Sequence, residues 1–391
     1  MLKAIICVLA ANASAADQLL PNGCEMVGKS KRVAPVEAAF QPVFPPVQVQ
    51  VRTPLEPTVL SSTGWSYLIY ELHLQNFTTA PVTIRGIEIL DADQPTMPPV
   101  AELMNAQVNA SLRQVTIGDD AINIRRLEVG QGAVAFLCLA FKTGVVVPAK
   151  LKHRVLFEAT VVDGPAISTH TTLLQRLGRP LVGTNWTPNN NPSLDSHHRM
   201  GLWVVDGVAR ISRRYAIDWK KYDSRGKQYS GDARDVRAYY AYGQKVLSVG
   251  NGIVVAARDG FPDNVPKTEA GFEPARPVTM KTVGGNQVII DLGNGQFAAY
   301  YHLQPGSIGV RVGDNVQRGQ LLARIGNSGD ARWPHLHFQV TDRIDVMASE
   351  GLPYVFDSYR VKTPDQDWKS RTDEYPMGDV VLDFGPDTVN K

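Results

Sequence analysis

The amino-acid sequence predicts a mainly β protein, with an N-terminal β-sandwich over residues 61–165 and a second β domain over residues 180–359. Short apolar segments with strand-like composition or alternation recur along the chain, and turn residues separate them. Long helical periodicity is missing. With 391 residues, of which 43% are hydrophobic, the chain is long enough for two domains that each bury a core.

The first sixteen residues have the pattern of a secretory signal peptide. Residues 1–3 supply a positive start, residues 4–10 are apolar, and small residues follow up to Ala15 and Ala16, where cleavage is expected. We therefore expect a secreted protein, located in the periplasm or outside the cell. No later stretch of 18 apolar residues occurs, so no membrane span is expected.

Two cysteines remain once residues 1–16, which include Cys7, are removed. Cys24 and Cys138 would be able to pair in an oxidising compartment. Cys138 lies in the apolar run of residues 134–141, however, where a buried free thiol is the simpler interpretation. The free thiol is therefore the expectation, and the disulfide is the alternative.

The segments outside the two expected domains differ from them in composition. Residues 17–60 are rich in proline and lack helical period, which indicates an extended segment. Residues 360–391 are charged and turn-rich, and we expect a tail or an edge there. Within the expected sandwich, the strand-like segments are residues 67–74, 82–89, 134–141 and 155–162.

The charge balance excludes one class of partner. Forty Lys and Arg against 38 Asp and Glu give a formal net charge of +2. So small a net charge creates no strong positive field, and nucleic acid is not expected as a partner. The sequence indicates no oligomeric state.

His335-Leu336-His337 is the most informative short motif. In a strand, residues i and i+2 project from the same face, so the two imidazoles would stand about 6–7 Å apart. That spacing suits one as a metal ligand and the other as a neighbour that handles protons. The Gly-rich residues 326–330 precede the motif and strand-like residues 338–340 follow it, which strengthens the interpretation.

Asp218 lies in the apolar, strand-like residues 215–219. A buried carboxylate without a partner is costly, so Asp218 needs a metal ion or a cation such as Arg213 or Arg214. His302 ends a further strand-like segment, and Tyr300 would share its face by the same i, i+2 rule. Tyr300 is therefore a candidate for the substrate groove, although core packing is the expected role of its side chain.

The succession of these motifs resembles the lysostaphin/LytM-type zinc endopeptidases. The resemblance extends from AIDW through GGNQVIIDLGNGQFAAYYHL to GNSGDARWPHLHFQV and spans residues 213–340. It implies a fold of two antiparallel sheets forming a groove that holds one Zn²⁺ per chain. It also implies hydrolysis of peptide cross-links in bacterial peptidoglycan, with stem or bridge peptides as partners. It does not distinguish cleavage of a D-Ala-to-diaminopimelate bond from cleavage of a glycine bridge.

The resemblance implies roles for individual residues. Asp218 and His337 correspond to two metal ligands of the family, and His302 and His335 correspond to its catalytic pair. Trp333 is a further groove candidate. Two imidazoles and a carboxylate leave a fourth zinc position for water, and no HExxH motif supplies a thermolysin-like alternative.

One departure from the family pattern concerns the remaining ligand. The family has a histidine four residues before the aspartate, where this chain has Arg214, and a guanidinium cannot bind zinc. A hairpin around Asp206-Gly207 would fold an upstream histidine back toward the site, and we prefer His198 over His197. The alternative is a catalytically degenerate LytM-like protein that binds or regulates cell-wall hydrolases.

Overall fold

The computed structural model describes residues 23–28, 47–114, 125–158, 160–363 and 366–387. The expected signal peptide, residues 1–16, lies outside them. The regular secondary structure of the described chain is nearly all strand, so the mainly β class is confirmed. The helical elements in the described residues are one α-helix, α1 (Ala106–Ser111), and short 3-10 helices at η2 (Val236–Ala238) and η3 (Val346–Ala348). Within the described residues, no helix is long and apolar enough to span a bilayer.

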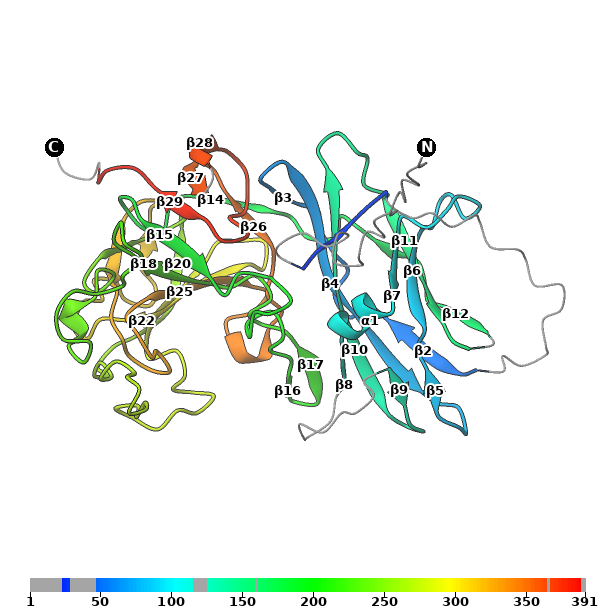
Figure 1. The fold of residues 1–391 in the computed structure, drawn as a ribbon. Helices are drawn as coiled ribbons and strands as arrows, with labels where there is room; N and C mark the ends of the chain where they lie inside the picture. Colours follow the sequence, from blue (N-terminus) through cyan, green and yellow to red (C-terminus); the bar gives the residue numbers. More distant parts are fainter. Residues whose placement is uncertain (1–22, 29–46, 115–124, 159, 364–365, 388–391) are drawn as a thin grey trace, which may run out of the picture.

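The N-terminal half of the described chain forms two sheets that share one hydrophobic core (Figure 1). The first sheet contains β1 (Glu25–Met26), β2 (Val49–Arg52), β3 (Leu60–Ser62), β4 (Trp65–Asn76), β8 (Leu112–Gln114) and β10 (Gly132–Lys142). The second contains β6 (Gly86–Asp91), β7 (Ala101–Met104), β11 (Lys150–Leu156), β12 (Val161–Asp163) and β13 (Ile167–Ser168). A separate pair joins β5 (Val82–Thr83) to β9 (Arg126–Leu127).

Two of the expected strands are interrupted. The segment 82–89 divides because Ile84 N–H bonds Arg125 C=O at 2.9 Å, whereas Arg85 N–H bonds Leu156 C=O at 2.7 Å, so the chain changes pairing partner there. The segment 155–162 spans the turn between β11 and β12, which no glycine or proline marks. Both expectations of a continuous strand are therefore wrong.

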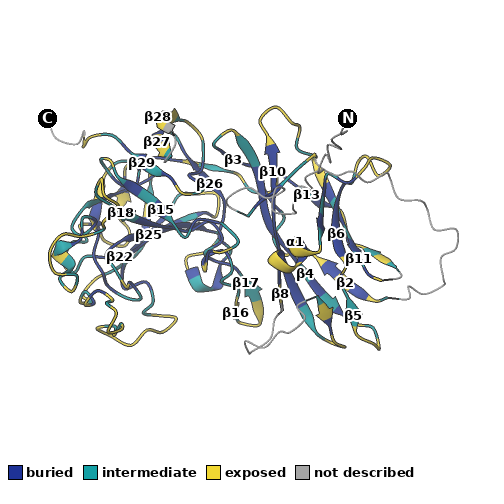
Figure 2. Ribbon diagram, in the orientation of Figure 1, coloured by how far each residue is buried: buried dark blue, intermediate teal, exposed yellow. Residues whose placement is uncertain are grey.

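Strands β4 and β10 are buried on both faces, as their dark blue ribbons indicate (Figure 2). Leu68 and Leu72 of β4 point into the core shared by the N-terminal sheets. Tyr67 and Ile69, on the opposite face, pack into the core of the C-terminal half. Strands covered on both sides have continuous apolar runs rather than alternation, which explains the sequence of both strands.

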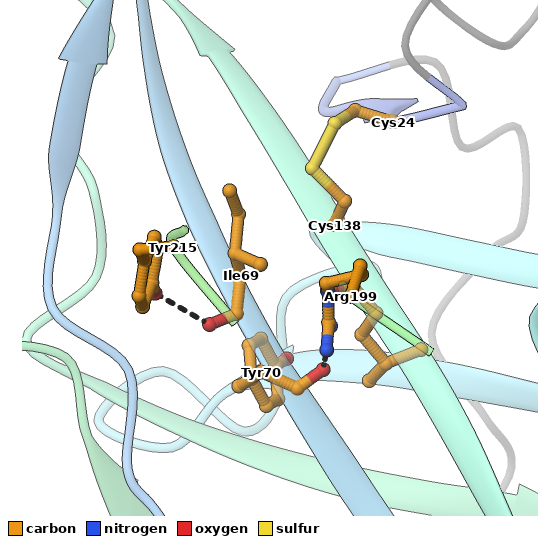
Figure 3. The surroundings of a disulfide bond; sticks show 7 residues. Cys24, Ile69, Tyr70, Cys138, Arg199 and Tyr215 are labelled. Carbon is orange, nitrogen blue, oxygen red and sulfur yellow. Dashed lines mark hydrogen bonds between the residues drawn. A yellow bond between two sulfur atoms is a disulfide. The ribbon is translucent and has the colours of Figure 1, made fainter. Parts of the chain in front are cut away.

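Cys24 and Cys138 form a disulfide, so the expectation of a free thiol is wrong (Figure 3). Cys24 directly precedes β1, which pairs in parallel with β10 so that Glu25 lies opposite Leu139. This pairing brings the two cysteine Cα atoms to 4.6 Å. The sequence could not indicate the bond because the contact depends on a parallel pairing between segments 114 residues apart.

Replacing both Cys24 and Cys138 by serine is expected to lower the free energy of unfolding by about 2–5 kcal/mol. The bond closes a long loop, and such a link removes much of the conformational entropy of the unfolded chain. Urea denaturation of the double variant and of the reduced wild type should give similar losses. A loss below about 1 kcal/mol in both would contradict the expectation.

His153 is expected to make the N-terminal sheets sensitive to acid. Its side chain is buried and bonds the Tyr70 hydroxyl at 2.8 Å, and burial lowers the pKa of His153 to about 3. The folded pKa lies below the unfolded value of about 6.5. This contribution to stability is therefore complete above pH 6.5 and is lost as the pH falls toward 3.

The loss from His153 at pH 5 amounts to about 2 kcal/mol, because each pKa unit corresponds to about 1.4 kcal/mol. His153→Gln should therefore show a shallower fall in unfolding free energy between pH 7 and pH 5 than the wild type. His170→Gln, which changes an exposed histidine, provides the matched control. Equal slopes for wild type and His153→Gln would refute the assignment.

The C-terminal half is built on a ten-stranded sheet of order β23-β20-β21-β22-β25-β18-β15-β29-β27-β28 (Figure 1). The bounds in chain order are β15 (Trp186–Asn189), β18 (Ile217–Lys221), β20 (Gly252–Arg258), β21 (Asn286–Asp291), β22 (Phe297–Leu303), β23 (Asn315–Val316), β25 (Leu336–Thr341), β27 (Tyr359–Thr363), β28 (Gln366–Arg371) and β29 (Val381–Asp383). Smaller pairs join β14 (Gln175–Leu177) to β26 (Tyr354–Phe356), β16 (Trp203–Val205) to β17 (Val208–Arg210), and β19 (Lys245–Leu247) to β24 (Leu321–Arg324). The described part of residues 360–391 thus contributes to one edge of the large sheet.

Candidate metal centre

Asp218 and His337 meet across two neighbouring strands near the centre of the ten-stranded sheet. β18 and β25 pair antiparallel, with Asp218 directly opposite His337. Their buried neighbours Ile217 and Phe338 fix this register from the core side. The pairing brings His337 Nδ1 to 2.8 Å from Asp218 Oδ1, although the two residues are 119 positions apart in the chain.

His198 reaches the same carboxylate from the segment between β15 and the β16–β17 hairpin. This hairpin turns at Asp206-Gly207 as expected, with positive φ at both residues, which is typical of a type I′ turn. His198 Nε2 lies 3.6 Å from Asp218 Oδ2, and its Nδ1 faces Ala216 C=O at 3.4 Å. His197 is exposed, yet His197, His198 and Asp218 offer ligand atoms within 4.8 Å of one another.

His302 and His335 lie beside this group, each with one ring nitrogen held by a backbone carbonyl. His302 Nδ1 is 2.8 Å from Ser328 C=O, and His335 Nδ1 is 2.7 Å from Trp333 C=O. A carbonyl only accepts, so each Nδ1 donates, and in the neutral ring Nε2 keeps its lone pair. His335 Nε2 lies 3.4 Å from Asp218 Oδ1, and the His302 and His335 ring centroids are 4.8 Å apart.

Tyr300 packs in the core, as expected, and its candidacy for the substrate groove is wrong. Its side chain is fully buried, and its hydroxyl accepts a hydrogen bond from Val249 N–H at 2.9 Å. The i, i+2 rule fails because His302 has a left-handed φ of 62°, which breaks the alternation of β22. Tyr301 lines the cleft instead and stacks on His337, with ring centroids 5.6 Å apart.

The histidines and Asp218 lie in a cleft of about 370 Å³. Trp333 lines it, and its Nε1 donates to Lys267 C=O at 3.0 Å. Lys267 belongs to the proline- and charge-rich segment 259–279 between β20 and β21, and its N–H bonds Arg332 C=O at 2.8 Å. This loop therefore holds Trp333 in its place at the edge of the cleft. The apolar part of the cleft lining further includes Trp203, Val278, Met280, Val346 and Met347.

The local electrostatics favour an ionised Asp218 together with neutral His198 and His302. Burial by itself would raise the pKa of Asp218, but the neighbouring His198 and His335, with hydrogen bonds from His335 and His337, hold that pKa well below its usual range. Burial lowers the pKa of His198 and of His302 well below the usual histidine value. At neutral pH these groups are thus in the protonation states that bind a divalent metal.

Gln339 shows that His337 and Asp218 together require a positive charge. Gln339 Nε2 donates to Ser212 C=O at 2.9 Å, so its Oε1 faces His337 Nε2 at 2.7 Å. His337 therefore has an acceptor at each ring nitrogen, whereas a neutral ring carries a single N–H. Either a second proton or a shared cation must neutralise the contact between His337 Nδ1 and Asp218.

The donor set fits zinc. Tetrahedral zinc with bonds of about 2.0–2.1 Å separates its ligand atoms by about 3.3 Å. The distances from Asp218 to His337 Nδ1 and to His198 Nε2, 2.8 and 3.6 Å, bracket this value. The ring nitrogens that face away from Asp218 contact the backbone of Ala216 and the side chain of Gln339, as is usual for metal-binding histidines.

Two residues that support the site were missed by sequence reasoning. Asn190 Nδ2 donates to Asp218 Oδ2 at 2.6 Å from an Asn-rich segment that contains no metal-binding motif. Gln339 could have been found, because it lies two residues after His337 on the same strand face. No comparable signal identifies Asn190, which reaches Asp218 from a turn with a φ of 55°.

Arg214 occupies the position of the family's histidine ligand but is directed elsewhere. Its Nη2 donates to Glu71 Oε2 at 2.8 Å and to Glu350 Oε2 at 2.9 Å. Arg199, the residue after His198, forms a second ion pair with Glu71. Among the described residues, no arginine or lysine forms an ion pair with Asp218, whose carboxylate contacts only histidines and Asn190.

Part of this site lies in a segment that matches a known protein family. Residues 234–348 match peptidase family M23. The matched range includes His302, His335 and His337, whereas His198 and Asp218 precede it. The family match therefore covers three of the histidines in the cleft and leaves two of the candidate metal ligands to the geometry.

Individual relatives match smaller or more distant parts. The peptidoglycan DD-endopeptidase ShyA of Vibrio cholerae is 41% identical over 59 residues, which cover 15% of this chain and 13% of that protein. Among solved structures, the catalytic domain of lysostaphin from Staphylococcus simulans is 18% identical, covers 45% of this chain and 88% of its own, and has a TM-score of 0.23. A zinc-containing peptidase from Vibrio cholerae is 16% identical over 79% of this chain and 87% of its own, with a TM-score of 0.22.

Proposed function

From the match of residues 234–348 to peptidase family M23, we propose that the protein is a zinc-dependent endopeptidase that hydrolyses peptide cross-links of bacterial peptidoglycan. One observation carries the proposal. His198 Nε2 and His337 Nδ1 both lie against the Asp218 carboxylate, in a cleft that also contains His302 and His335. Stem or bridge peptides would bind along this cleft.

The role of each histidine would depend on which of its ring nitrogen atoms is free. His198, Asp218 and His337 would hold one Zn²⁺, with His197 as the alternative to His198. Bound zinc lowers the pKa of a water ligand to about 7 and polarises a carbonyl group. His302 and His335, whose Nδ1 atoms are occupied by carbonyls, would use Nε2 to accept the proton of the attacking water and to return it to the departing amine.

Export of the protein is part of the proposal. The Cys24–Cys138 disulfide supports it, because disulfides persist in oxidising compartments such as the periplasm and the extracellular space. The signal-like residues 1–16 point the same way. A peptidoglycan substrate would also be met only outside the cytoplasmic membrane.

Digestion of purified cross-linked muropeptides tests the proposal. The zinc-loaded protein should release products with new amine and carboxyl ends, identified by mass spectrometry. A chelator should stop the reaction, and added zinc should restore it. A protein that binds the muropeptides without creating new ends would instead support the second candidate, a non-catalytic LytM-like protein that regulates wall hydrolases, to which Arg214 in place of a ligand histidine points.

A further inference from the structure

Two cationic side chains enter the cleft beside the candidate metal site. Arg213 and Lys220 both line it, and both are half-buried. Lys220 lies two residues after Asp218 on β18, so the two side chains share a face of that strand. Arg213 belongs to the turn that precedes β18.

Among the described residues, no carboxylate lies within ion-pair distance of either cation. In the part of the chain that the structure describes, neither side chain forms an ion pair or a hydrogen bond. The acidic residues that line the cleft are Asp218 and Asp330. Asp330 is paired with Arg332 at 2.9 Å, and Asp218 is engaged by the histidines and Asn190.

The surroundings hold each cation against an aromatic wall. The Arg213 guanidinium lies 5.9 Å from the Trp203 ring centroid, and Lys220 Nζ lies 5.3 Å from that of Trp333. Arg213 Nε is buried and has no hydrogen-bond partner among the described residues. An unsatisfied buried donor is costly, which favours a ligand that accepts its hydrogen bond.

We propose that Arg213 and Lys220 bind carboxylate groups of an anionic peptide substrate and thereby determine its specificity; this inference rests on the proposed function. With Arg332 and Asp330 neutralising each other, a divalent metal, Asp218, Arg213 and Lys220 leave a net charge of +3 in the cleft. Such a cleft attracts peptides with free carboxylates near the cleaved bond. A neutral glycine bridge would form no ionic interaction with Arg213 or Lys220.

The test compares one cross-linked peptide in two forms, with its carboxylates free or amidated. We expect the wild type to cleave the free form with about 10- to 100-fold higher kcat/KM, the range of a hydrogen bond to a charged group. Arg213→Gln and Lys220→Gln should each lose that factor on the free form and change little on the amidated form. Arg234→Gln and Lys227→Gln remove the same charges from exposed positions outside the cleft and should behave as wild type.

Equal losses on both peptide forms, or no loss in Arg213→Gln and Lys220→Gln, would overturn the inference. Binding of both peptide forms to the same proteins, measured by fluorescence anisotropy, distinguishes a failure of the inference from a failure of the proposed function. If the wild type cleaves neither form but binds the free form at least about tenfold more tightly, and both variants lose this preference, the inference stands although hydrolysis fails. If it cleaves both forms equally and binds them equally, hydrolysis stands and the inference fails.

Discussion

Replacing Glu71 by glutamine is expected to lower the free energy of unfolding by about 3–5 kcal/mol. Glu71 lies on β4 and is 2% exposed, and its partners Arg199 and Arg214 are 0% and 2% exposed. Arg214 contacts Glu71 Oε2 from Nε at 3.0 Å and from Nη2 at 2.8 Å. A neutral amide would leave Arg214 with Glu350 and remove the carboxylate that faces Arg199, and such an unbalanced buried charge is strongly destabilising.

The Glu71 cluster also connects the N-terminal sheets to the candidate metal site. Arg199 directly follows His198, and its Nη2 donates to Tyr70 C=O at 2.8 Å (Figure 3). Tyr215, between Arg214 and Asp218, donates its hydroxyl to Ile69 C=O at 2.9 Å. Glu71→Gln is therefore expected to weaken zinc binding by about 10- to 100-fold, the range found for residues that orient metal ligands.

Urea denaturation and a competition assay with a chromophoric chelator measure the two effects of Glu71→Gln. The matched control is Glu158→Gln, which removes the exposed partner of Arg85 and should cost at most about 1 kcal/mol without affecting zinc. A Glu71→Gln protein as stable as this control would contradict the role assigned to the buried cluster. If Glu71→Gln lowered stability but left zinc affinity unchanged, the cluster would stabilise the fold without orienting the metal ligands.

Replacing His335 by alanine is expected to lower kcat by about 10²- to 10⁴-fold while the protein keeps its zinc. His335 Nδ1 is held by Trp333 C=O, which leaves Nε2 directed toward the cleft, 3.4 Å from Asp218 Oδ1. In the proposed division of roles this nitrogen moves a proton and binds no metal. Steady-state hydrolysis of a cross-linked muropeptide and the zinc content of the same sample give the two readouts.

His170→Ala provides the control for His335→Ala, because His170 is exposed and does not line the cleft. It should leave both hydrolysis and zinc content unchanged. If His335→Ala instead lost its zinc together with its activity, His335 would be a metal ligand, and the assignment of His337 as the ligand of this pair would have to be revised.

Local sequence patterns predicted many of the strands and identified Asp218 as a candidate site residue. Asp218 was singled out because a carboxylate in an apolar strand needs a partner, and its register opposite His337 supplies one. The hairpin at Asp206-Gly207 was predicted because its turn residues tolerate positive φ. In both cases the signal lay within a few residues of sequence.

The remaining features depend on contacts that no local pattern encodes. The groove candidacy of Tyr300 failed because the left-handed φ of His302 reverses the alternation at the end of β22. The disulfide of Cys24 depends on the parallel pairing of β1 with β10. Glu71 appears in the sequence as one charge in an apolar strand, and its two arginine partners lie 128 and 143 residues further along the chain.

The zinc content of His198→Ala, compared with that of wild type and His197→Ala, tests the central claim most directly. All three proteins would be loaded with zinc, passed over a desalting column and measured by inductively coupled plasma mass spectrometry. The claim predicts close to one zinc per chain for wild type and His197→Ala, and close to none for His198→Ala with its fold intact by circular dichroism. Retention of a full zinc equivalent by folded His198→Ala would contradict it.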